Sequence, residues 1–327
     1  MMIIENYKTF KGQHCETNAI GNLLINTGIE LSEPMIFGLA SGLGYIFWNM
    51  KIMDFPFIGG RIKPDEITEN ICRILNLKLN KHETASTKIA WDVVKKQIDN
   101  SIPVGLKLDS YHLDYFTNKI HFAGHYATIY GYDEKYAYLI DTVQQGSKVK
   151  AMLNNMALAR NEKGPMSSKN LSFTIEKTDK IPDLKDIIPI AIVQNAKDFL
   201  NPPIKNVGYK GIEKTSKEIF KWFEASKNVE KDFKLQAMLM ERAGTGGALF
   251  RNIYREFLFE SYKLTQNKKI DLAHNYYIEI SALWTKVSSL FNQVGETKDI
   301  GYIKQASVTL QLIADKEKMA MELLEKI

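Results

Sequence analysis

Cysteine is scarce in this sequence, which has two, Cys15 and Cys72, among 327 residues. So few cysteines argue against a disulfide framework and fit a reducing compartment. The sequence also lacks paired Cys-x-x-Cys motifs, a His-Glu-x-x-His motif and a P-loop. We therefore expect no bound metal and no cofactor.

Long apolar runs and clustered basic residues are missing as well. No stretch approaches the length of a membrane span, and the first residues, MMIIENYKTF, lack the basic segment and long apolar core of a signal peptide. The net charge of +5 is modest, and no Lys/Arg run is interleaved with aromatic residues as in a nucleic-acid groove. We expect a cytoplasmic protein that binds neither membranes nor nucleic acid.

The most informative stretch that is present runs from Lys11 to Tyr45. After Cys15, apolar residues recur at helical spacing as far as Ile25, and a Thr-Gly pair then marks the end of the helix. Cys15 thus lies at or near a helix N-terminus, where unpaired N–H groups and the helix dipole favour a thiolate and could hold an oxyanion. The alternative is a small buried core residue, as most lone intracellular cysteines are.

A histidine and a carboxylate that could activate this cysteine lie on a predicted β-hairpin. The sequences AGHYATIYGY (123–132) and YAYLI (136–140) are typical of two antiparallel strands joined by a turn. His125 begins the first strand and Asp141 follows the second, so the two come close in space. A histidine held by a carboxylate is the base that cysteine nucleophiles use. The alternative is a structural histidine and an unrelated turn residue.

Several other residues are candidates for substrate binding. His14 adjoins the cysteine, the glycines of the SGLGY turn permit close approach to a ligand, and the Gly-rich turn of ERAGTGGALFRNIYREFL could bind an anion or a polar ligand at a helix N-terminus. The alternative for that last turn is an interhelix loop with an internal Glu241–Arg251 salt bridge. The candidate substrate-binding residues are Gln13, His14, Gly42, Tyr45, Glu241, Thr245 and Arg251.

The pattern along the chain predicts an α+β part followed by an all-α part, which we place at 1–180 and 181–327. Besides the hairpin, we expect strands at 46–57, 102–109 and 171–176, and helices at 33–40, 63–75, 86–100 and 152–160. Beyond the sequence KTDKIPDLKD, we expect helices at 187–200, 212–225, 231–242, 250–264, 270–291 and 302–326. These amphipathic helices could pack internally or against a second copy, so a homo-oligomer stays open.

Two stretches resemble a known family. GQHCETNAIGNLLINTGIELSEPMIFGLASGLGY closely resembles the N-terminal domain of the butirosin-biosynthesis protein BtrH family, and GTGG followed by FRxxYxxFL resembles the helical domain that accompanies it. The segments GHYATIYGYD and LIDT resemble the histidine and aspartate segments of papain-like and bacteriocin-peptidase-like cysteine enzymes. The resemblance implies a papain-like core, with a helix bearing the cysteine and an antiparallel sheet, followed by an all-α domain.

In activity, the resemblance implies an acyltransferase that moves an aminoacyl group from a thioester on an acyl carrier protein to an amine of an aminoglycoside. Cys15 would accept the acyl group, His125 would act as the base and Asp141 would orient it. The implied partners are an acyl carrier protein and a small-molecule amine. One departure is that papain-like enzymes commonly place an oxyanion-donating glutamine several residues before the cysteine, whereas Gln13 lies two residues before it.

Two other functions fit the same residues. A cysteine peptidase or amidase would use the same three side chains but would transfer the acyl group to water. A binding protein on the same scaffold would be catalytically silent, and its thiol would show ordinary reactivity.

Overall fold

The computed structural model describes residues 1–50, 53–164 and 167–327. Within these ranges the chain forms two compact units. The first is made of Met1–Ile36 and Pro64–Pro182, and the second of Phe37–Lys63 and Asp183–Ile327. The division after residue 182 lies close to the boundary expected from sequence, but residues 37–63, which we placed in the N-terminal domain, belong to the second unit.

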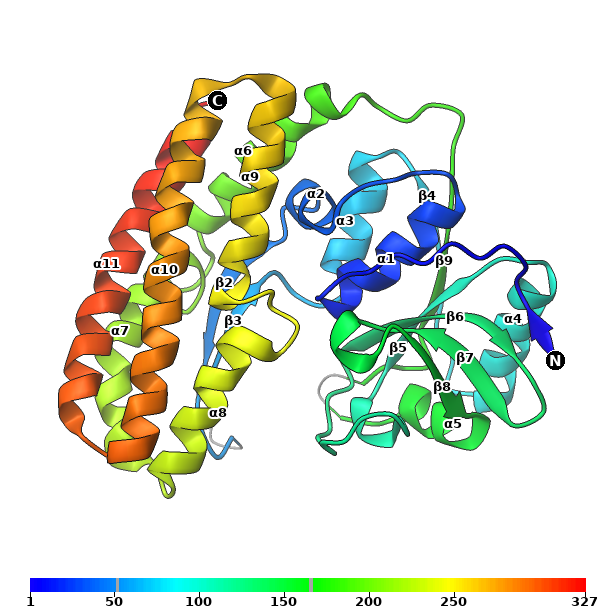
Figure 1. The fold of residues 1–327 in the computed structure, drawn as a ribbon, viewed down its shortest axis with the longest axis horizontal. Helices are drawn as coiled ribbons and strands as arrows, with labels where there is room; N and C mark the ends of the chain where they lie inside the picture. Colours follow the sequence, from blue (N-terminus) through cyan, green and yellow to red (C-terminus); the bar gives the residue numbers. More distant parts are fainter. Residues whose placement is uncertain (51–52, 165–166) are drawn as a thin grey trace. The chain divides into compact units, whose positions relative to one another are not determined.

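The first unit is built on an antiparallel sheet with the order β4-β9-β5-β6-β7-β8, and β1 pairs with the end of β6 (Figure 1). Its strands are β1 (Met2–Ile3), β4 (Lys78–His82), β5 (Val104–Leu108), β6 (His125–Tyr132), β7 (Tyr136–Ile140), β8 (Lys148–Met152) and β9 (Ser172–Glu176). Its helices are α1 (Cys15–Asn26), α3 (Glu66–Ile74), α4 (Thr87–Asp99) and α5 (Leu153–Asn161), and α2 (Glu33–Leu39) begins in this unit.

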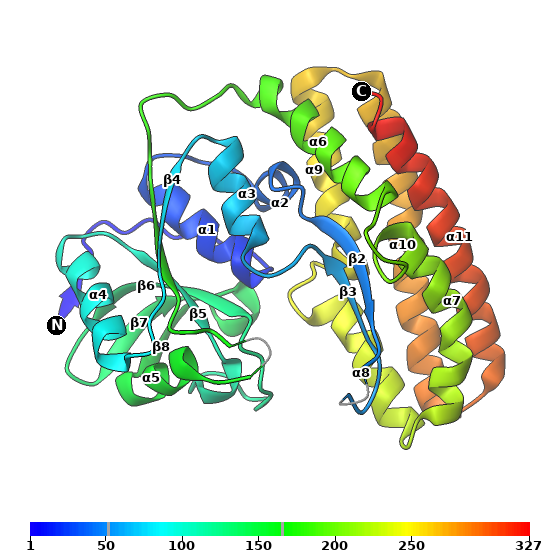
Figure 2. The same ribbon diagram turned by 180° about the vertical axis from the view of Figure 1, so that it is seen from behind.

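Helices cover both faces of this sheet. On one face lie α4 and α5 (Figure 2). They contribute Val94, Ile98 and Met156 to a buried apolar core that includes alternate residues of β6, as the period of two in a strand requires. On the other face, the Thr128 hydroxyl of β6 donates to the Ala19 carbonyl of α1 at 3.2 Å. The Cys15 helix is therefore fixed against the strand that begins with His125.

The register of the central strands sets where the hairpin ends meet. Strand β6 pairs with β5, with His125 opposite Leu108, and with β7, with Thr128 opposite Ile140. Asp141, the residue after β7, therefore lies near the start of β6. The predicted hairpin and the α+β class, a cysteine-bearing helix with an antiparallel sheet followed by a helical region, are confirmed.

The strand expected at 46–57 is wrong. The structure has a hairpin there, β2 (Leu43–Trp48) and β3 (Phe57–Arg61), and residues 51–52 of the predicted strand lie outside the described residues. The aromatic run hid the turn, because aromatic residues are frequent in strands and no Asn-Gly or Asp-Gly pair marks the reversal. Strands β4 and β8 were not predicted.

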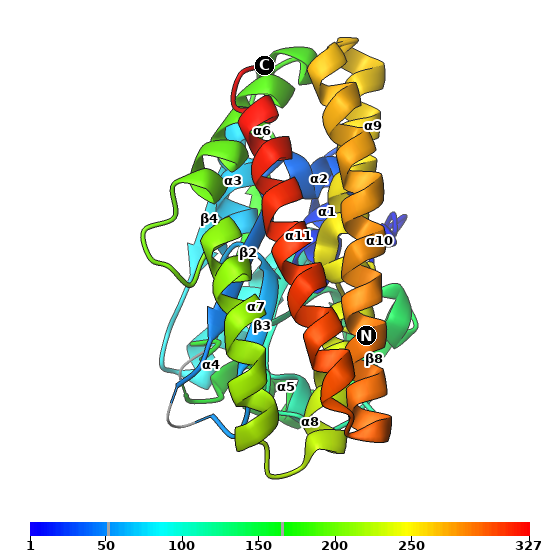
Figure 3. The ribbon, with the colours of Figure 1, turned by 90° about the vertical axis from the view of Figure 1, so that its left-hand side faces the viewer.

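The second unit packs the β2–β3 hairpin with helices. These are α6 (Leu184–Leu200), α7 (Gly208–Ala225), α8 (Val229–Arg242), α9 (Arg251–Thr265), α10 (Lys268–Thr297) and α11 (Ile300–Leu324). Helices α10 and α11 lie side by side (Figure 3), and the fully buried Trp284 of α10 stacks on Tyr45 of β2 with ring centroids 5.7 Å apart. Among the described residues, no helix has the length and apolar character that crossing a membrane would require.

Candidate active site

Cys15 is the first residue of α1, as its position before the apolar repeat predicted. The preceding residue, His14, is the N-cap, and its Nδ1 accepts a hydrogen bond from the Thr17 N–H at 3.4 Å. The N–H groups of a first helical turn have no partner within the helix, so they favour an anion at this position. The Cys15 side chain lies in that field and is 8% exposed.

The segment before Cys15 is held along α1 by three asparagine side chains, four residues apart on the helix. Each asparagine accepts a hydrogen bond from one backbone N–H of the segment, and the three donors are alternate residues. The pairs are Asn18 with Gly12 at 2.8 Å, Asn22 with Phe10 at 3.0 Å and Asn26 with Lys8 at 3.1 Å. Asn22 and Asn26 also donate to the carbonyls of Phe10 and Lys8. This asparagine ladder fixes the approach of the chain to the cysteine.

Glu33, the first residue of α2, fixes the residues directly beside Cys15. Its carboxylate accepts the backbone N–H of Gln13 at 2.9 Å, that of His14 at 2.9 Å and the Thr17 hydroxyl at 2.7 Å. Burial raises the pKa of Glu33, and these three hydrogen bonds partly offset that rise. A buried carboxylate with three donors ties α2 to the start of α1, so it supports the position of the cysteine.

The structure brings Cys15, His125 and Asp141 together. His125 Nε2 lies 2.7 Å from Asp141 Oδ2, and the imidazole also forms a hydrogen bond with Cys15. Asp141 is fully buried, and its Oδ1 accepts the Thr142 N–H at 2.6 Å. The three side chains come from the start of a helix and the two ends of a hairpin. They have the order of nucleophile, base and orienting carboxylate that activated cysteines use.

The electrostatics of the site favour a charged imidazole. Burial lowers the pKa of His125, but the negative charge of Asp141, its hydrogen bond and the contact with Cys15 outweigh burial and raise the pKa to about 10. His125 is therefore an imidazolium at neutral pH. A cation beside a thiol at a helix N-terminus stabilises the thiolate, which is the reactive form of cysteine.

Two neighbouring residues of the site were missed by sequence reasoning. The Tyr115 hydroxyl donates to Asp141 Oδ2 at 2.7 Å, the same oxygen that contacts His125. The Phe116 ring stands edge-on to the His125 ring, with centroids 5.1 Å apart. Both lie in the loop between β5 and β6, and the only available signal was the aromatic pair just ahead of the histidine strand.

Replacing Tyr115 with phenylalanine should lower the free energy of unfolding by about 1.5–3 kcal/mol, the range for a hydrogen bond to a charged group. The rate of Cys15 alkylation should stay within about threefold of the unmodified protein's, because Asp141 keeps its bonds to His125 and to the Thr142 backbone. Urea unfolding and iodoacetamide kinetics measure the two quantities. A loss of reactivity as large as that of Asp141→Asn would show instead that Tyr115 sets the position of the carboxylate.

The other predicted residues of the first unit have different surroundings. His14 is buried and caps α1 through Nδ1, so its role in the structure is that of a helix cap. The Gln13 side chain is exposed, and its backbone N–H is bound by Glu33. Substrate contact by either residue stays a prediction.

Gly42 and Tyr45 belong to the second unit. A side chain at Gly42 would meet the Phe37 carbonyl at 2.7 Å, so this glycine allows close packing of backbone on backbone. Tyr45 is 1% exposed, and its hydroxyl lies 2.5 Å from that of Thr215. Both residues are engaged inside the unit, and their binding roles stay predictions.

Two polar side chains of the Gly-rich turn form hydrogen bonds within the second unit. Glu241 accepts the Ala248 N–H at 3.2 Å, and the Thr245 hydroxyl donates to the Met240 carbonyl at 2.8 Å. The expected alternative of a Glu241–Arg251 salt bridge is wrong, because the fully buried Arg251 forms two hydrogen bonds to Glu317, at 2.8 and 2.9 Å. Sequence reasoning missed the Arg251–Glu317 pair because the two residues are 66 positions apart in the chain.

The backbone just before Arg251 is strained. Three consecutive residues, Ala248, Leu249 and Phe250, have φ of 48°, 49° and 74°, a region that costs a side-chain-bearing residue about 1–3 kcal/mol. Arg251 Nη1 donates to the Leu249 carbonyl at 2.8 Å and stabilises this conformation. The buried arginine therefore has a structural role in the turn where we predicted ligand binding.

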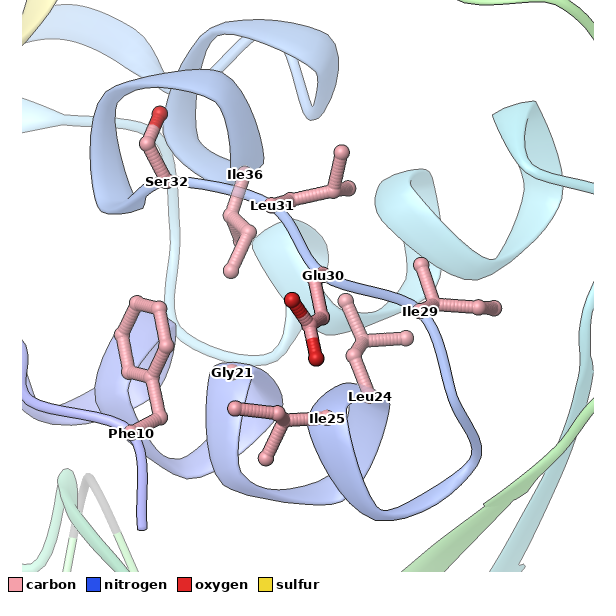
Figure 4. A pocket seen from close by; sticks show the side chains of 9 residues that line it. All are labelled: Phe10, Gly21, Leu24, Ile25, Ile29, Glu30, Leu31, Ser32 and Ile36. Carbon is pink, nitrogen blue, oxygen red and sulfur yellow. The ribbon is translucent and has the colours of Figure 1, made fainter. Parts of the chain in front are cut away.

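A hollow of about 370 Å³ lies along the second half of α1 (Figure 4). Its walls come from the segment before α1, from α1 itself, from the linker that follows and from α2. They are formed by Phe10, Gly21, Leu24, Ile25, Ile29, Glu30, Leu31, Ser32 and Ile36. None of Cys15, His125 and Asp141 lines it, so this hollow is separate from the candidate active site.

Two family models match the chain. A model described as "Butirosin biosynthesis protein H, N-terminal" matches residues 14–142, and one described as "Domain of unknown function (DUF4872)" matches residues 154–324, more than half of the chain. The first match spans Cys15, His125 and Asp141 and ends at the residue after the aspartate. The second begins in α5, so it includes the last helix and strand of the first unit. A search of curated proteins found no match.

Proposed function

The chain belongs to the family that joins the N-terminal domain of butirosin biosynthesis protein H to a DUF4872 domain, and on this premise we propose that it is a cysteine-dependent acyltransferase. The observation that carries the proposal is Cys15 at a helix N-terminus, hydrogen-bonded to a histidine that a buried aspartate holds. By resemblance to the family, the donor is an acyl group on a carrier-protein thioester and the acceptor is a small-molecule amine.

In the first step, the Cys15 thiolate attacks the thioester carbonyl. The carbon–sulfur bond to the carrier breaks, and a new thioester forms on Cys15. The carrier leaves as a thiolate and takes the proton of the His125 imidazolium. One thioester replaces another, so the step is nearly balanced in energy and the site needs to stabilise only the tetrahedral intermediate.

In the second step, the amine attacks the Cys15 thioester. The neutral His125 takes a proton from the attacking nitrogen, the carbon–sulfur bond breaks, and the product is an amide. The thiolate and imidazolium are restored together, so protons and charge balance over the cycle. Asp141 keeps the ring in position throughout, because its carboxylate is fully buried and bonded to Nε2.

The oxyanion of both intermediates would be held by backbone. Gln13, the glutamine just before the cysteine in the sequence, has an exposed side chain, and its N–H already donates to Glu33. The N–H of Cys15 itself, in the first turn of α1, is the donor that fits this role best. Burial of the thiol and the Phe116 ring on His125 support the exclusion of water, which an acyl transfer requires.

Replacing Cys15 with alanine should abolish both the covalent intermediate and the transfer. An acyl thioester of N-acetylcysteamine serves as the donor probe, and intact-protein mass spectrometry should show one acyl adduct on the unmodified protein and none on Cys15→Ala. Cys72→Ala is the matched control and should acquire the adduct at the unmodified protein's rate. Undiminished transfer by Cys15→Ala would contradict the proposal.

The acceptor separates transfer from hydrolysis. The rate at which the acyl adduct disappears should rise with the concentration of an added amine, and the product should be an amide. A hydrolase would release free acid equally well with and without the amine. A binding protein on this scaffold would form no adduct at all.

A further inference from the structure

A second group of titratable side chains lies outside the Cys15 site, in the first unit. His112, His121 and Glu162 each offer one ligand atom, and these three atoms lie within 4.8 Å of one another. They come from separate places in the chain. His112 lies in the short helical turn after β5, His121 lies four residues before β6, and Glu162 is the residue after α5. The mechanism above uses none of them.

Each of the two histidines is already held by a carboxylate. His112 Nε2 lies 2.6 Å from Glu162 Oε2. His121 Nδ1 lies 3.1 Å from Oδ2 of Asp109, a carboxylate with 1% exposure. Metal-binding histidines almost always give their second nitrogen to a carboxylate or carbonyl, which fixes the ring and the tautomer. With Nδ1–H donated to Asp109, His121 Nε2 carries the lone pair that a metal takes.

Asp109 is itself held firmly. Its Oδ1 accepts the backbone N–H of Tyr111 at 2.9 Å and that of Phe122 at 3.0 Å. The Tyr111 ring also stacks on the His121 ring, with centroids 4.0 Å apart. The support for His121 is thus built from both ends of the same loop, which is the kind of arrangement that positions a ligand before a metal arrives.

We propose that His112, His121 and Glu162 form a binding site for a single divalent transition-metal ion, with zinc as the best fit. Two imidazoles and one carboxylate are ligands that zinc accepts, and three protein ligands leave a fourth position for water or another group. Tetrahedral bonds of about 2.0–2.1 Å place ligand atoms roughly 3.3 Å apart, so small rotamer changes from the present arrangement suffice. A hard cation such as magnesium prefers oxygen ligands and fits less well.

Such a site would act on the loop that carries Tyr115 and Phe116. His112 and His121 lie on either side of this loop, and a shared metal would tie its two ends to the residue after α5. Tyr115 donates to Asp141, and Phe116 contacts His125. Metal binding would therefore order the residues that support the Cys15 site, without a ligand from that site.

Zinc uptake by the full-length protein tests this proposal. Isothermal titration calorimetry should show one zinc ion per chain, and His112→Gln, His121→Gln and Glu162→Gln should each weaken binding by at least tenfold. Cobalt provides a second measurement, since a tetrahedral site gives intense visible absorption that the same variants should lose. Hydrogen exchange in residues 113–120 should slow when zinc is added. Circular dichroism verifies that each variant is folded.

Two control variants separate this site from others. His274→Gln removes a histidine of the second unit, and Cys15→Ser removes the thiol that could bind zinc together with His125. Both should keep the zinc stoichiometry and affinity of the unmodified protein. Failure to take up stoichiometric zinc, unchanged affinity in His112→Gln and His121→Gln, or loss of binding in Cys15→Ser would each overturn the proposal. None of these outcomes tests the proposed acyltransferase function, which is tested separately by acyl-adduct formation on Cys15.

Discussion

We expect His125→Ala to lower the rate of Cys15 alkylation by iodoacetamide about thirtyfold at pH 7 and about three-hundredfold at pH 6. The reason is that a free thiol, with a pKa of about 8.5, loses thiolate tenfold for each pH unit below that value. In the unmodified protein the imidazolium of His125 faces the sulfur over this whole range, because the pKa of His125 is raised to about 10. Acyl transfer should fall further, by about 10²- to 10⁴-fold, since the variant also lacks the proton carrier.

The same histidine makes the stability of the fold depend on pH in a defined direction. Its folded-state pKa of about 10 exceeds the ordinary value of 6.5, so the folded protein binds this proton more tightly than the unfolded chain does. The resulting stabilisation is present in full below about pH 6.5 and is lost as the pH rises toward 10. The stability difference between the unmodified protein and His125→Gln should therefore shrink across that interval in urea unfolding experiments.

Two controls make the alkylation experiment specific. Burial raises the pKa of Cys72 to about 12, so that thiol should contribute little, and a Cys72→Ala background removes it entirely. His82→Ala removes a histidine on the edge strand β4 and should leave the rate unchanged. If His125→Ala alkylated as fast as the unmodified protein at pH 6, the imidazolium would have no part in activating Cys15.

The second large effect is expected in the helical unit, where Glu317→Gln should destabilise the fold by about 3–5 kcal/mol. Arg251 and Glu317 have fully buried side chains, and Trp284 also donates to Glu317, at 2.7 Å. Removing the carboxylate charge leaves the guanidinium buried without a counter-charge, which is far more costly than losing a surface pair. Unfolding followed by tryptophan fluorescence measures the change.

The adjacent residue provides a matched control. Lys316 pairs with Glu279 at 2.6 Å, but the two side chains are 26% and 62% exposed. Lys316→Met should therefore change stability by less than about 1 kcal/mol. The double variant Arg251→Met/Glu317→Leu should be more stable than Glu317→Gln alone, because it removes both buried charges together. A cost below 1 kcal/mol for Glu317→Gln would mean that the arginine charge is solvated by some other route.

Sequence reasoning succeeded where a local pattern decides the structure. The helix after Cys15 follows from apolar spacing, and the β6–β7 hairpin follows from two β-branched and aromatic runs around a turn. It failed at β4 and β8, with sequences KLNKH and KVKAM. Both are edge strands, and lysines on an edge suppress pairing with other chains while removing the apolar pattern that identifies a strand.

The residues of the candidate site likewise fall into those that sequence reasoning could predict and those that it could not. Cys15, His125 and Asp141 could be proposed because each lies at the end of a predictable element. Glu33 and Tyr115 could not, because their contacts join segments 16 to 26 residues apart through side chains whose direction depends on the packed structure. The Arg251–Glu317 pair spans 66 residues, and several acidic residues on the C-terminal helices were equally plausible partners.

The asparagine ladder beside α1 makes the length of the N-terminal segment as significant as its composition. Two residues of an extended chain advance about 6.7 Å, and four residues of a helix advance about 6 Å. The two repeat lengths therefore match closely enough for three hydrogen-bonded pairs, although they differ by more than half an ångström per repeat. Adding or removing one residue between Gly12 and Cys15 would shift all three bonded N–H groups relative to their asparagines. The number of residues between the asparagine ladder and Cys15 is therefore fixed, as the register between two paired strands is fixed in a β-sheet.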